Sequence, residues 1–347
     1  MGNKHEAWEL AQMQSLSLES KIRMTQQRIR AWYDHWEGQV YVSFSGGKDS
    51  TVLKHIIDEM YDDVPALFVN TGLEYPEIQK FAMSQKNVVT VRPEMRFDEV
   101  LKKYGYPVIS KDVSQTVKTA RRNKNTYRYK KITGIATDKN GNKSIFNMPQ
   151  WYFLLEAPFE TSSSCCDVMK KRPIHKYEKE TRRKPFIATM ASESRNRKTA
   201  WMKNGCNAFD AKKPKSQPLS FWTEQDVLLY LKKYNVPYCS VYGDIVIDEK
   251  VDGENILEGQ MNMIDYLGCH TQEDKLKTTG CNRTGCIFCM FGCHLEKEPN
   301  RFQMLKETHP KQYKYCIGGG GMVDGKWQPS KEGLGLGKVL DYIGVEY

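Results

Sequence analysis

Two groups of residues in this 347-residue chain have the types and spacing needed for chemistry. The first is the contiguous run SGGKDS, residues 45–50, between the strand-like VYVSF and the helix-like TVLKHIIDEM. Glycines at a strand-to-helix turn let backbone N–H groups approach an anion closely. Lys48 can supply a positive charge, and Asp49 can hold Mg²⁺ on a pyrophosphate. The run predicts a phosphate-binding turn, with a tight turn that binds nothing as the alternative.

The second group consists of cysteines, of which the chain has ten. The N-terminus lacks an apolar signal core and no apolar run is long enough to span a membrane, so we expect a cytoplasmic protein with reduced thiols. Six cysteines are spread along the chain, at 165, 166, 206, 239, 269 and 316. The other four fall within thirteen residues, at 281, 286, 289 and 293. A C-x-x-C pair suits one metal or cluster. A zinc site made by the last four alone and a set of buried free thiols are the alternatives.

Strand and helix patterns alternate around the glycine turn. We expect strands over 39–44, 65–71, 88–93 and 185–191, and helices over 51–61, 75–85, 96–105 and 223–236. This order predicts an α/β fold with a doubly wound, mostly parallel sheet. In such sheets ligands bind beyond the carboxyl ends of the strands, where the glycine turn lies.

Composition divides the chain into three expected parts. Residues 1–37 form an N-terminal helix, 38–243 the α/β domain with a basic insertion at 112–150, and 244–347 a cysteine-rich region with a glycine-rich, irregular tail. The insertion, interpreted as an arm and hairpin, contains KTARRNKNTYRYKK, with seven Lys or Arg and two tyrosines. Together with the net charge of +10, it predicts a nucleic-acid contact through 112–131, with a solvated hairpin as the alternative.

Several motifs resemble one enzyme family. SGGKDS resembles the PP-loop of the adenine nucleotide α-hydrolase superfamily, which has a Rossmann-like fold. FVNTGLEYPEIQKF (68–81), MASESRNR (190–197) and PLSFWTEQDVLLYLKKYNVPYCSVYG (218–243) resemble segments of its phosphoadenosine phosphosulfate (PAPS) reductase family. The adjacent cysteines and the later C-x-x-C resemble the [4Fe–4S] signature of that family's iron–sulfur branch. An insertion around 244–280 lengthens the gap between the two cysteine pairs.

The resemblance implies roles for particular residues. An adenine nucleotide (ATP, adenylyl sulfate or PAPS) with Mg²⁺ would contact Ser45, Gly46, Gly47, Lys48, Asp49, Ser50, Thr71, Gly72, Arg195 and Arg197. A cluster would be held by Cys165, Cys166, Cys286 and Cys289. Asn70 stands where the family has Asp. The family's reductases carry a late nucleophilic cysteine beside glutamate and histidine, whereas the late Cys316 here lacks those neighbours.

Three functions remain open on this basis. The first is an ATP-dependent enzyme that uses Lys48 and Asp49 to adenylate a target, releasing pyrophosphate, for sulfur transfer or nucleic-acid modification. It would resemble the DNA phosphorothioation enzymes and take sulfur or electrons from a cysteine desulfurase or a thioredoxin-type donor. The second is a sulfonucleotide reductase that makes sulfite with Cys316 as nucleophile. The third is a non-catalytic nucleotide- or nucleic-acid-binding module.

Overall fold

The computed structural model describes residues 4–248 and 275–347. Cys269 and most of the expected insertion at 244–280 lie outside the described residues. The chain forms two compact units. Unit 1 consists of Met1–Phe68, Tyr75–Thr90 and Glu178–Thr284, and unit 2 of Val69–Glu74, Val91–Tyr177 and Gly285–Tyr347.

Unit 1 is built on a six-stranded sheet in the order β3-β2-β1-β4-β6-β5. The strands are β1 (Val40–Phe44), β2 (Ala66–Val69), β3 (Val88–Val91), β4 (Lys184–Ile187), β5 (Asn207–Ala208) and β6 (Lys215–Ser216). Strand β1 pairs in parallel with both β2 and β4, β4 pairs in parallel with β6, and β5 runs antiparallel to β6. The sheet therefore confirms the expected α/β class. From β1 the strand order continues to one side through β2 and β3, and the chain then returns to place β4 on the other side of β1. Sheets of this kind bind ligands at such a switch point.

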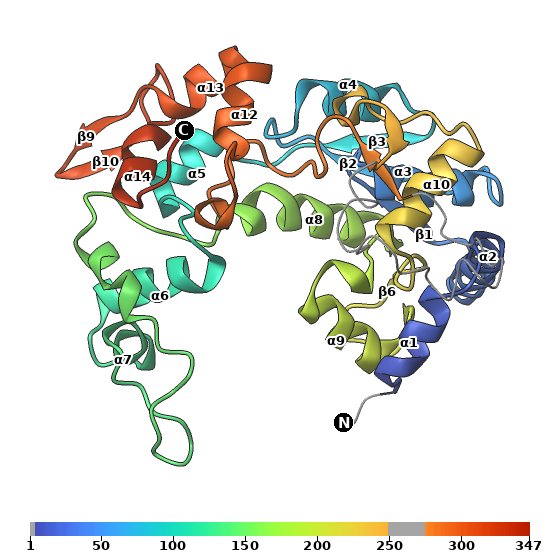
Figure 1. Cartoon of the computed structure of the whole chain (residues 1–347), viewed down its shortest axis with the longest axis horizontal. Helices are drawn as coiled ribbons and strands as arrows, with labels where there is room; N and C mark the ends of the chain where they lie inside the picture. The colour runs from blue at the N-terminus through green and yellow to red at the C-terminus, as the bar shows by residue number, and fades with distance from the viewer. Residues whose placement is uncertain (1–3, 249–274) are drawn as a thin grey trace, which may run out of the picture. The chain divides into compact units, whose positions relative to one another are not determined.

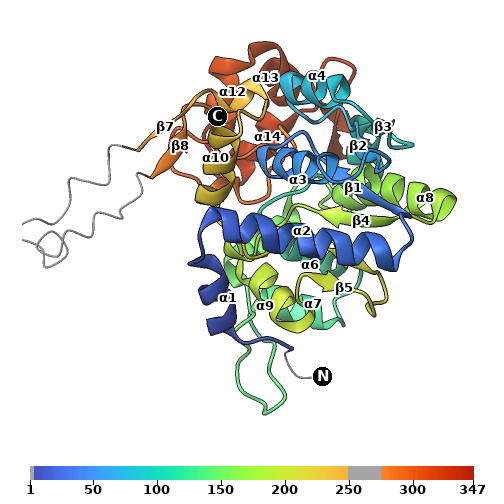
Figure 2. The same cartoon turned by 90° about the vertical axis from the view of Figure 1, so that its right-hand side faces the viewer.

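Helices cover the sheet of unit 1. They are α1 (Ala7–Gln14), α2 (Leu18–His35), α3 (Lys48–Asp58), α4 (Pro76–Ser84), α9 (Arg195–Asn204) and α10 (Glu224–Lys233). Figures 1 and 2 both draw α2, α3 and α10 side by side next to the strands, and these helices contact one another. Their apolar faces meet the strands in a core that contains the fully buried Trp32 and Trp222. A short antiparallel pair, β7 (Ile245–Ile247) and β8 (Leu276–Thr278), completes the unit.

The N-terminal segment is two helices rather than the single helix expected over residues 5–37. Helix α1 ends at Gln14, and Ser17 begins α2 by accepting a hydrogen bond from the Ser20 N–H at 3.3 Å. A serine in extended conformation is a preferred N-cap, because its hydroxyl satisfies a free N–H group of the first turn. The apolar periodicity continues through the break, so periodicity alone does not reveal it.

Unit 2 is mainly helical. Its elements are α5 (Phe97–Tyr104), α6 (Lys111–Arg122), α7 (Tyr127–Thr133), α12 (Arg301–Thr308), α13 (Pro310–Ile317), α14 (Leu336–Tyr342) and the hairpin of β9 (Gly321–Val323) and β10 (Lys326–Gln328). Helix α8 (Arg172–Thr181) begins in unit 2 and ends in unit 1. The expected basic hairpin at 112–150 is instead the helix pair α6 and α7, followed by a turn closed by one bridge between Thr137 and Lys143.

The observed units differ from the three consecutive parts expected from the sequence. The chain passes from one unit to the other near residues 68, 75, 90, 177 and 284, so neither unit is continuous. Amino-acid composition changes gradually along a sequence, so it does not indicate where the chain passes from one unit to the other. The glycine-rich tail also has regular structure, because it contains the β9–β10 hairpin and α14.

Candidate functional site

The SGGKDS run forms the turn from β1 into α3 in unit 1. Gly46 has φ of +72°, a left-handed conformation that favours glycine. A Cβ atom at Gly46 would lie 3.0 Å from Ile78 Cγ2 and 3.1 Å from the Ile78 carbonyl oxygen. Gly47 is the N-cap of α3, and no side-chain hydrogen bond caps the helix. The first turn of α3 therefore has N–H groups at the carboxyl end of β1, as a phosphate-binding turn requires.

The two serines of the run stabilise the turn itself. The Ser50 hydroxyl donates to the Gly47 carbonyl at 2.9 Å and accepts from the Ser45 N–H at 3.2 Å. The Ser45 hydroxyl lies 3.1 Å from that of Ser50 and accepts from the Gly47 N–H at 3.3 Å. Ser45 is exposed and Ser50 is buried. Both hydroxyls, expected from the sequence to contact a phosphate, thus also fix the backbone conformation that would receive one.

Lys48 and Asp49 carry opposite charges within the turn. Lys48 is 5% exposed, and its Nζ lies 3.5 Å from Asp49 Oδ1 and 3.1 Å from Glu224 Oε1 on α10. Burial acts to lower the pKa of Lys48, but the Asp49 and Glu224 carboxylates outweigh it and raise that pKa, so the ammonium stays charged. Burial raises the pKa of Asp49 despite the neighbouring Lys48. Asp49 Oδ1 is buried and makes no hydrogen bond to any described residue. A buried carboxylate oxygen in this state suits a divalent cation.

Besides Glu224, two further residues that the sequence did not predict as site residues, Tyr242 and Asn282, contact the turn, and Thr284 contacts one of them. The hydroxyl of Tyr242 accepts a hydrogen bond from the Lys48 N–H at 3.2 Å. The Thr284 hydroxyl lies 2.7 Å from the same tyrosine oxygen. The Asn282 carbonyl accepts from Lys48 Nζ at 3.3 Å. The first N–H of α3 is therefore already hydrogen-bonded, to a tyrosine hydroxyl. Tyr242 lies in PYCSVYG, the end of the segment 218–243 that resembles the family. That resemblance is the sequence feature from which Tyr242 could have been predicted as a site residue.

The two candidate anion-binding arginines differ in environment. Arg195 is exposed at the start of α9. Arg197 forms an ion pair with Glu193, whose carboxylate also accepts from the Met190 N–H at 2.9 Å. Burial and the nearby Arg283 lower the pKa of Arg197, while Asp49 acts to raise it. Arg197 therefore lies within electrostatic reach of the SGGKDS turn.

The NTGLE motif lies in unit 2. The Thr71 hydroxyl donates to Glu74 Oε1 at 2.7 Å, and the Thr71 N–H donates to Glu74 Oε2 at 3.0 Å. Gly72 has φ of +73° and is exposed. The Leu73 carbonyl accepts from the Ile287 N–H at 2.8 Å, which ties the motif to the turn between Cys286 and Cys289. Thr71 and Gly72 are thus placed beside the cysteines of the same unit.

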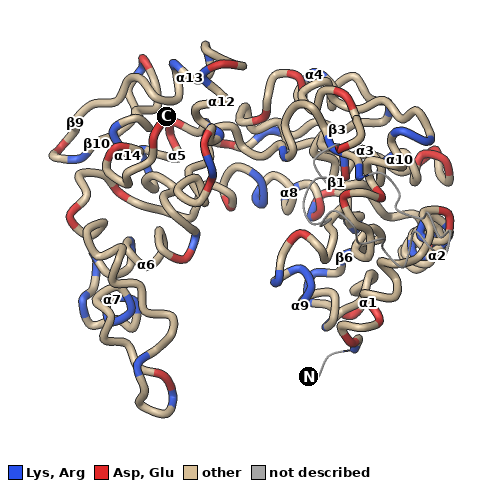
Figure 3. The backbone as a smooth tube through the Cα atoms, viewed as in Figure 1, with Lys and Arg blue, Asp and Glu red and all other residues tan. Residues whose placement is uncertain are grey.

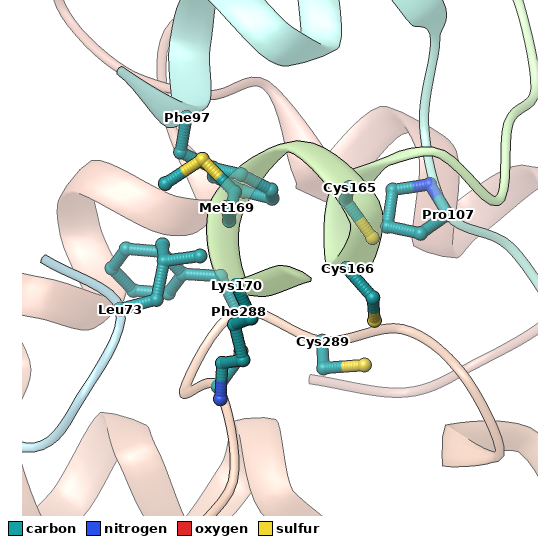
Figure 4. A pocket seen from close by; sticks show the side chains of 10 residues that line it. Leu73, Phe97, Pro107, Cys165, Cys166, Met169, Lys170, Phe288 and Cys289 are labelled. Carbon is teal, nitrogen blue, oxygen red and sulfur yellow. The ribbon is translucent and has the colours of Figure 1, made fainter. Parts of the chain in front are cut away.

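Four cysteines from two distant segments line one pocket of unit 2. Cys165 and Cys166 open a helix that continues through a π-helical turn, Asp167–Lys171, into α8. Cys286 and Cys289 flank a tight turn, with the Cys289 N–H donating to the Cys286 carbonyl at 3.0 Å. Leu73, Phe97, Met169 and Phe288 are among the apolar residues that enclose them. Figure 4 shows the side chains of Cys165, Cys166 and Cys289 near one another in this pocket.

Charged groups around the pocket act on the thiols. A hydrogen bond from Cys165 lowers the pKa of Cys166, and Lys111 and Lys170 lower it further. Burial raises the pKa of Cys286 to about 11, partly offset by Lys170. The cysteine and Glu74 charges hold the pKa of Lys170 above its usual value against its burial. A cation beside several thiols suits a centre that binds them as thiolates.

Four thiols at one pocket are donors that an iron–sulfur cluster or zinc can use. Within residues 4–248 and 275–347, no three His, Cys, Asp or Glu side chains are grouped so that they could hold a single metal ion. Thiolates on one zinc lie about 2.3 Å from it, and so within about 4 Å of each other. Cys293, which the zinc alternative needs, instead donates to the Met290 carbonyl at 3.0 Å.

Cys316, the candidate nucleophile, is fully buried in α13. Burial raises the pKa of its thiol well above the usual value. Reactive cysteines are partly exposed and lie near positive charge. Cys316 therefore has the environment of a structural thiol.

The basic run at 112–131 is partly used inside unit 2. The Arg121 guanidinium donates to four backbone carbonyls between Leu154 and Phe159. Lys131 and Arg128 form ion pairs with Asp112. These three cations stabilise the packing of α6, α7 and the following loop, so the number of Lys and Arg in the run overstates the charge available to a partner.

One protein family and several individual proteins are similar to this chain. The family described as Phosphoadenosine phosphosulfate reductase domain matches residues 39–138 and 111–290. Two relatives are uncharacterized proteins of Methanocaldococcus jannaschii: MJ0973 is 34% identical over 23% of this chain, and MJ0066 is 26% identical over 62% of it. The matched regions span only 21% and 35% of those two proteins. No helix among the described residues is long and apolar enough to cross a membrane.

Two solved structures are similar to part of the chain. One is a phosphoadenylyl-sulfate reductase from Candida auris in complex with phosphate, 16% identical, with a TM-score of 0.35, covering 65% of this chain and 91% of that one. The other is the U34-tRNA thiolase NcsA from Methanococcus maripaludis with its [4Fe–4S] cluster, 17% identical, with a TM-score of 0.31, covering 63% and 66%. With the family match extending over more than half of its length, the chain belongs to the phosphoadenosine phosphosulfate reductase domain family.

Proposed function

We propose that this protein binds ATP and Mg²⁺ at the SGGKDS turn and adenylates an acceptor, releasing pyrophosphate, as the activating step of sulfur transfer to a nucleic acid. The observation that carries the proposal is the turn itself. It joins a strand to a helix at the switch point of the sheet, with Lys48 buried at its centre. Asp49 Oδ1 is buried beside Lys48 without a hydrogen bond to a described residue.

Each group of the turn has a defined part in this proposal. The N–H groups at the start of α3 would bind phosphate oxygens, and the helix dipole favours negative charge there. Lys48 would neutralise the β- and γ-phosphates, since Asp49 and Glu224 keep its ammonium charged. Asp49 would hold Mg²⁺ through its buried oxygen. Arg197 would supply a second cation if the phosphates displace it from Glu193.

The reaction is a nucleotidyl transfer. An oxygen of the acceptor attacks the α-phosphorus of ATP and forms a new P–O bond. The bond from that phosphorus to the bridging oxygen breaks, and the electron pair leaves with pyrophosphate. Lys48 stabilises the charge that develops on the leaving group, and Mg²⁺ held by Asp49 would add positive charge there. The acceptor is thereby activated for displacement of AMP by a sulfur nucleophile.

Cys165, Cys166, Cys286 and Cys289 would hold a [4Fe–4S] cluster in the pocket of unit 2. Such a cluster, when bound, can carry sulfur or electrons. Lys170 balances the negative charge of the thiolates. Leu73, Phe97 and Phe288 give the pocket an apolar lining. The Arg301 guanidinium fixes the turn by donating to the Cys289 carbonyl at 2.9 Å.

Pyrophosphate release from ATP tests the proposal. The protein, reconstituted with iron and sulfide, is assayed with MgATP and a pool of RNA and single-stranded DNA. Asp49→Asn is expected to lower the initial rate by about 100-fold or more, the size of effect seen when a preorganised charge is removed from a transition state. Asp58→Asn is the matched control, because it makes the same change on α3 where the carboxylate pairs with Lys54. Equal rates for the two variants would contradict the assignment of Asp49.

Sulfonucleotide reduction is the second candidate, favoured by the family to which the chain belongs. That reaction needs a thiolate to attack the sulfonate sulfur. The buried Cys316 does not meet this need in the described structure. Sulfite production from adenylyl sulfate or PAPS by the reduced protein, with no pyrophosphate release from ATP, would replace the first proposal with this one.

A further inference from the structure

We propose that a cationic cleft in unit 2 binds the sugar–phosphate backbone of a single-stranded nucleic acid. The cleft lies between the end of α5, one side of α6 and strand β10, and it has a volume of about 220 Å³. Only the interpretation of this strand as the acceptor rests on the proposed function; the binding itself does not.

Positive charge dominates the lining of the cleft. Five cationic side chains and one carboxylate line it: Lys102, Lys103, Lys118, Arg122, Lys326 and Glu160. The carboxylate is already paired, since Lys326 Nζ lies 2.5 Å from Glu160 Oε1. Burial and then the neighbouring Arg122 lower the pKa of Lys118, which shows that like charges are crowded here. An anion in the cleft would relieve that repulsion.

The cations of α6 are divided between internal and external roles. Arg121 is used by the backbone carbonyls of the loop after α7. Lys118 and Arg122 are four residues apart, so they project from the same side of the helix. Among the described residues, neither forms an ion pair with a carboxylate. The Lys and Arg positions on α6 and near β10 can be followed in Figure 3.

Aromatic rings are placed among these cations. The Tyr104 ring lies 5.5 Å from Lys103 Nζ and 5.5 Å from Lys118 Nζ. Trp327 is held rigidly, because its Nε1 donates to the Gly335 carbonyl at 2.8 Å and its N–H to the Pro158 carbonyl at 2.6 Å. A Cβ at Gly320 would lie 2.4 Å from Trp327 Cζ2, so the glycine-rich tail allows the backbone to approach the indole.

Alternating cations and half-buried rings favour a single strand over a duplex. Unpaired bases can stack on aromatic side chains while lysines and arginines contact the phosphates. A duplex keeps its bases stacked internally and presents only its backbone to such a cleft. RNA and DNA share this chemistry, and the binding assay separates them.

Fluorescence anisotropy of labelled 15-nucleotide RNA and DNA strands, measured without ATP, tests the site. The double variant Lys118→Glu/Arg122→Glu is expected to weaken binding of the preferred strand at least tenfold. It should also reduce the slope of log affinity against log salt by about 1.4, since each phosphate contact in a single strand contributes about 0.7. A duplex of the same sequence should bind more weakly than the strand, and tighter duplex binding would overturn the single-strand assignment.

The matched control is Lys124→Glu/Lys130→Glu, which makes the same charge change at exposed residues outside the cleft. It should weaken binding less than threefold with the same salt slope as the unmodified chain. Equal losses in both double variants, or no binding of either strand by the unmodified protein, would overturn the cleft. If the unmodified protein binds the strand as expected but releases no pyrophosphate from ATP, the proposed function is refuted and the strand-binding site is still supported.

Discussion

Removal of the Tyr242 hydroxyl is expected to tighten ATP binding. In the described structure this hydroxyl accepts the Lys48 N–H at 3.2 Å, which is a hydrogen bond that the proposal assigns to a phosphate oxygen. Nucleotide must therefore displace the tyrosine hydroxyl before it can use the first N–H of α3. In Tyr242→Phe the ring remains, but the N–H has no partner until a phosphate arrives.

The size of the effect follows from the one hydrogen bond exchanged. A neutral hydrogen bond contributes about 0.5–1.5 kcal/mol net. Since about 1.4 kcal/mol corresponds to a tenfold change in affinity, Tyr242→Phe should lower the Kd for ATP by about two- to tenfold. The nucleotide-free variant should melt at a slightly lower temperature, because it buries an unsatisfied N–H in place of a bonded one.

Isothermal titration with MgATP measures the change directly. Tyr238→Phe is the control, since it removes a nearby tyrosine hydroxyl that donates to the Gly243 carbonyl at 3.1 Å and does not contact the turn. Its Kd should equal that of the unmodified protein, because this hydroxyl donates to Gly243 and not to the turn. Weaker ATP binding by Tyr242→Phe would mean that the hydroxyl contacts the nucleotide, and an unchanged Kd would mean that the Lys48 N–H lies outside the nucleotide site. Either result refutes the reasoning.

Three further changes test other parts of the structure. Cys286→Ser should lose most of the about four irons per chain expected of a cluster, while Cys281→Ser should keep them. Iron and zinc analysis decides, and bound zinc that is lost from both variants would favour the zinc site. Cys316→Ala should leave the pyrophosphate-release rate unchanged, because the thiol is fully buried, and a large loss of turnover in the folded variant would restore it as a nucleophile. Lys21→Ala should lower the free energy of unfolding of unit 1 by about 3–5 kcal/mol, because it leaves Asp226 buried without the lysine that lies 2.7 Å away. Urea denaturation measures this change. Glu19→Gln, which breaks the exposed ion pair with Lys233, is the control, and its denaturation midpoint should not move.

The turn and its flanking elements could be predicted from the sequence because the signals are local. Glycines, a strand-like run and a helix-like run lie next to one another at residues 40–58, and the structure confirms β1 and α3 there. The split between α1 and α2 was missed, since Ser17 interrupts the helix without interrupting its apolar periodicity.

The surroundings of the turn could not be predicted in the same way. Glu224 and Tyr242 reach Lys48 from more than 170 residues along the chain, and only the fold brings them together. A C-x-x-C spacing indicates that Cys286 and Cys289 act together. Their joining with Cys165 and Cys166 was implied by the family resemblance, and the structure places all four at one pocket.

Charge counting also has a physical limit. Seven cations in KTARRNKNTYRYKK suggested a basic arm that contacts nucleic acid. Arg121, Arg128 and Lys131 instead satisfy carbonyls and Asp112 inside unit 2. The cations left for a partner are identified only by their neighbours, and the cleft combines Lys118 and Arg122 with Lys326 from more than 200 residues away.

The central claim is that the SGGKDS turn directs cleavage of ATP between its α- and β-phosphates. Phosphorus NMR of MgATP incubated with the reconstituted protein and a pool of RNA and single-stranded DNA identifies the products. We expect pyrophosphate to form together with AMP or an adenylated acceptor, and expect neither from the Asp49→Asn variant. Formation of ADP and inorganic phosphate, or ATP that remains intact under all these conditions, would contradict the claim.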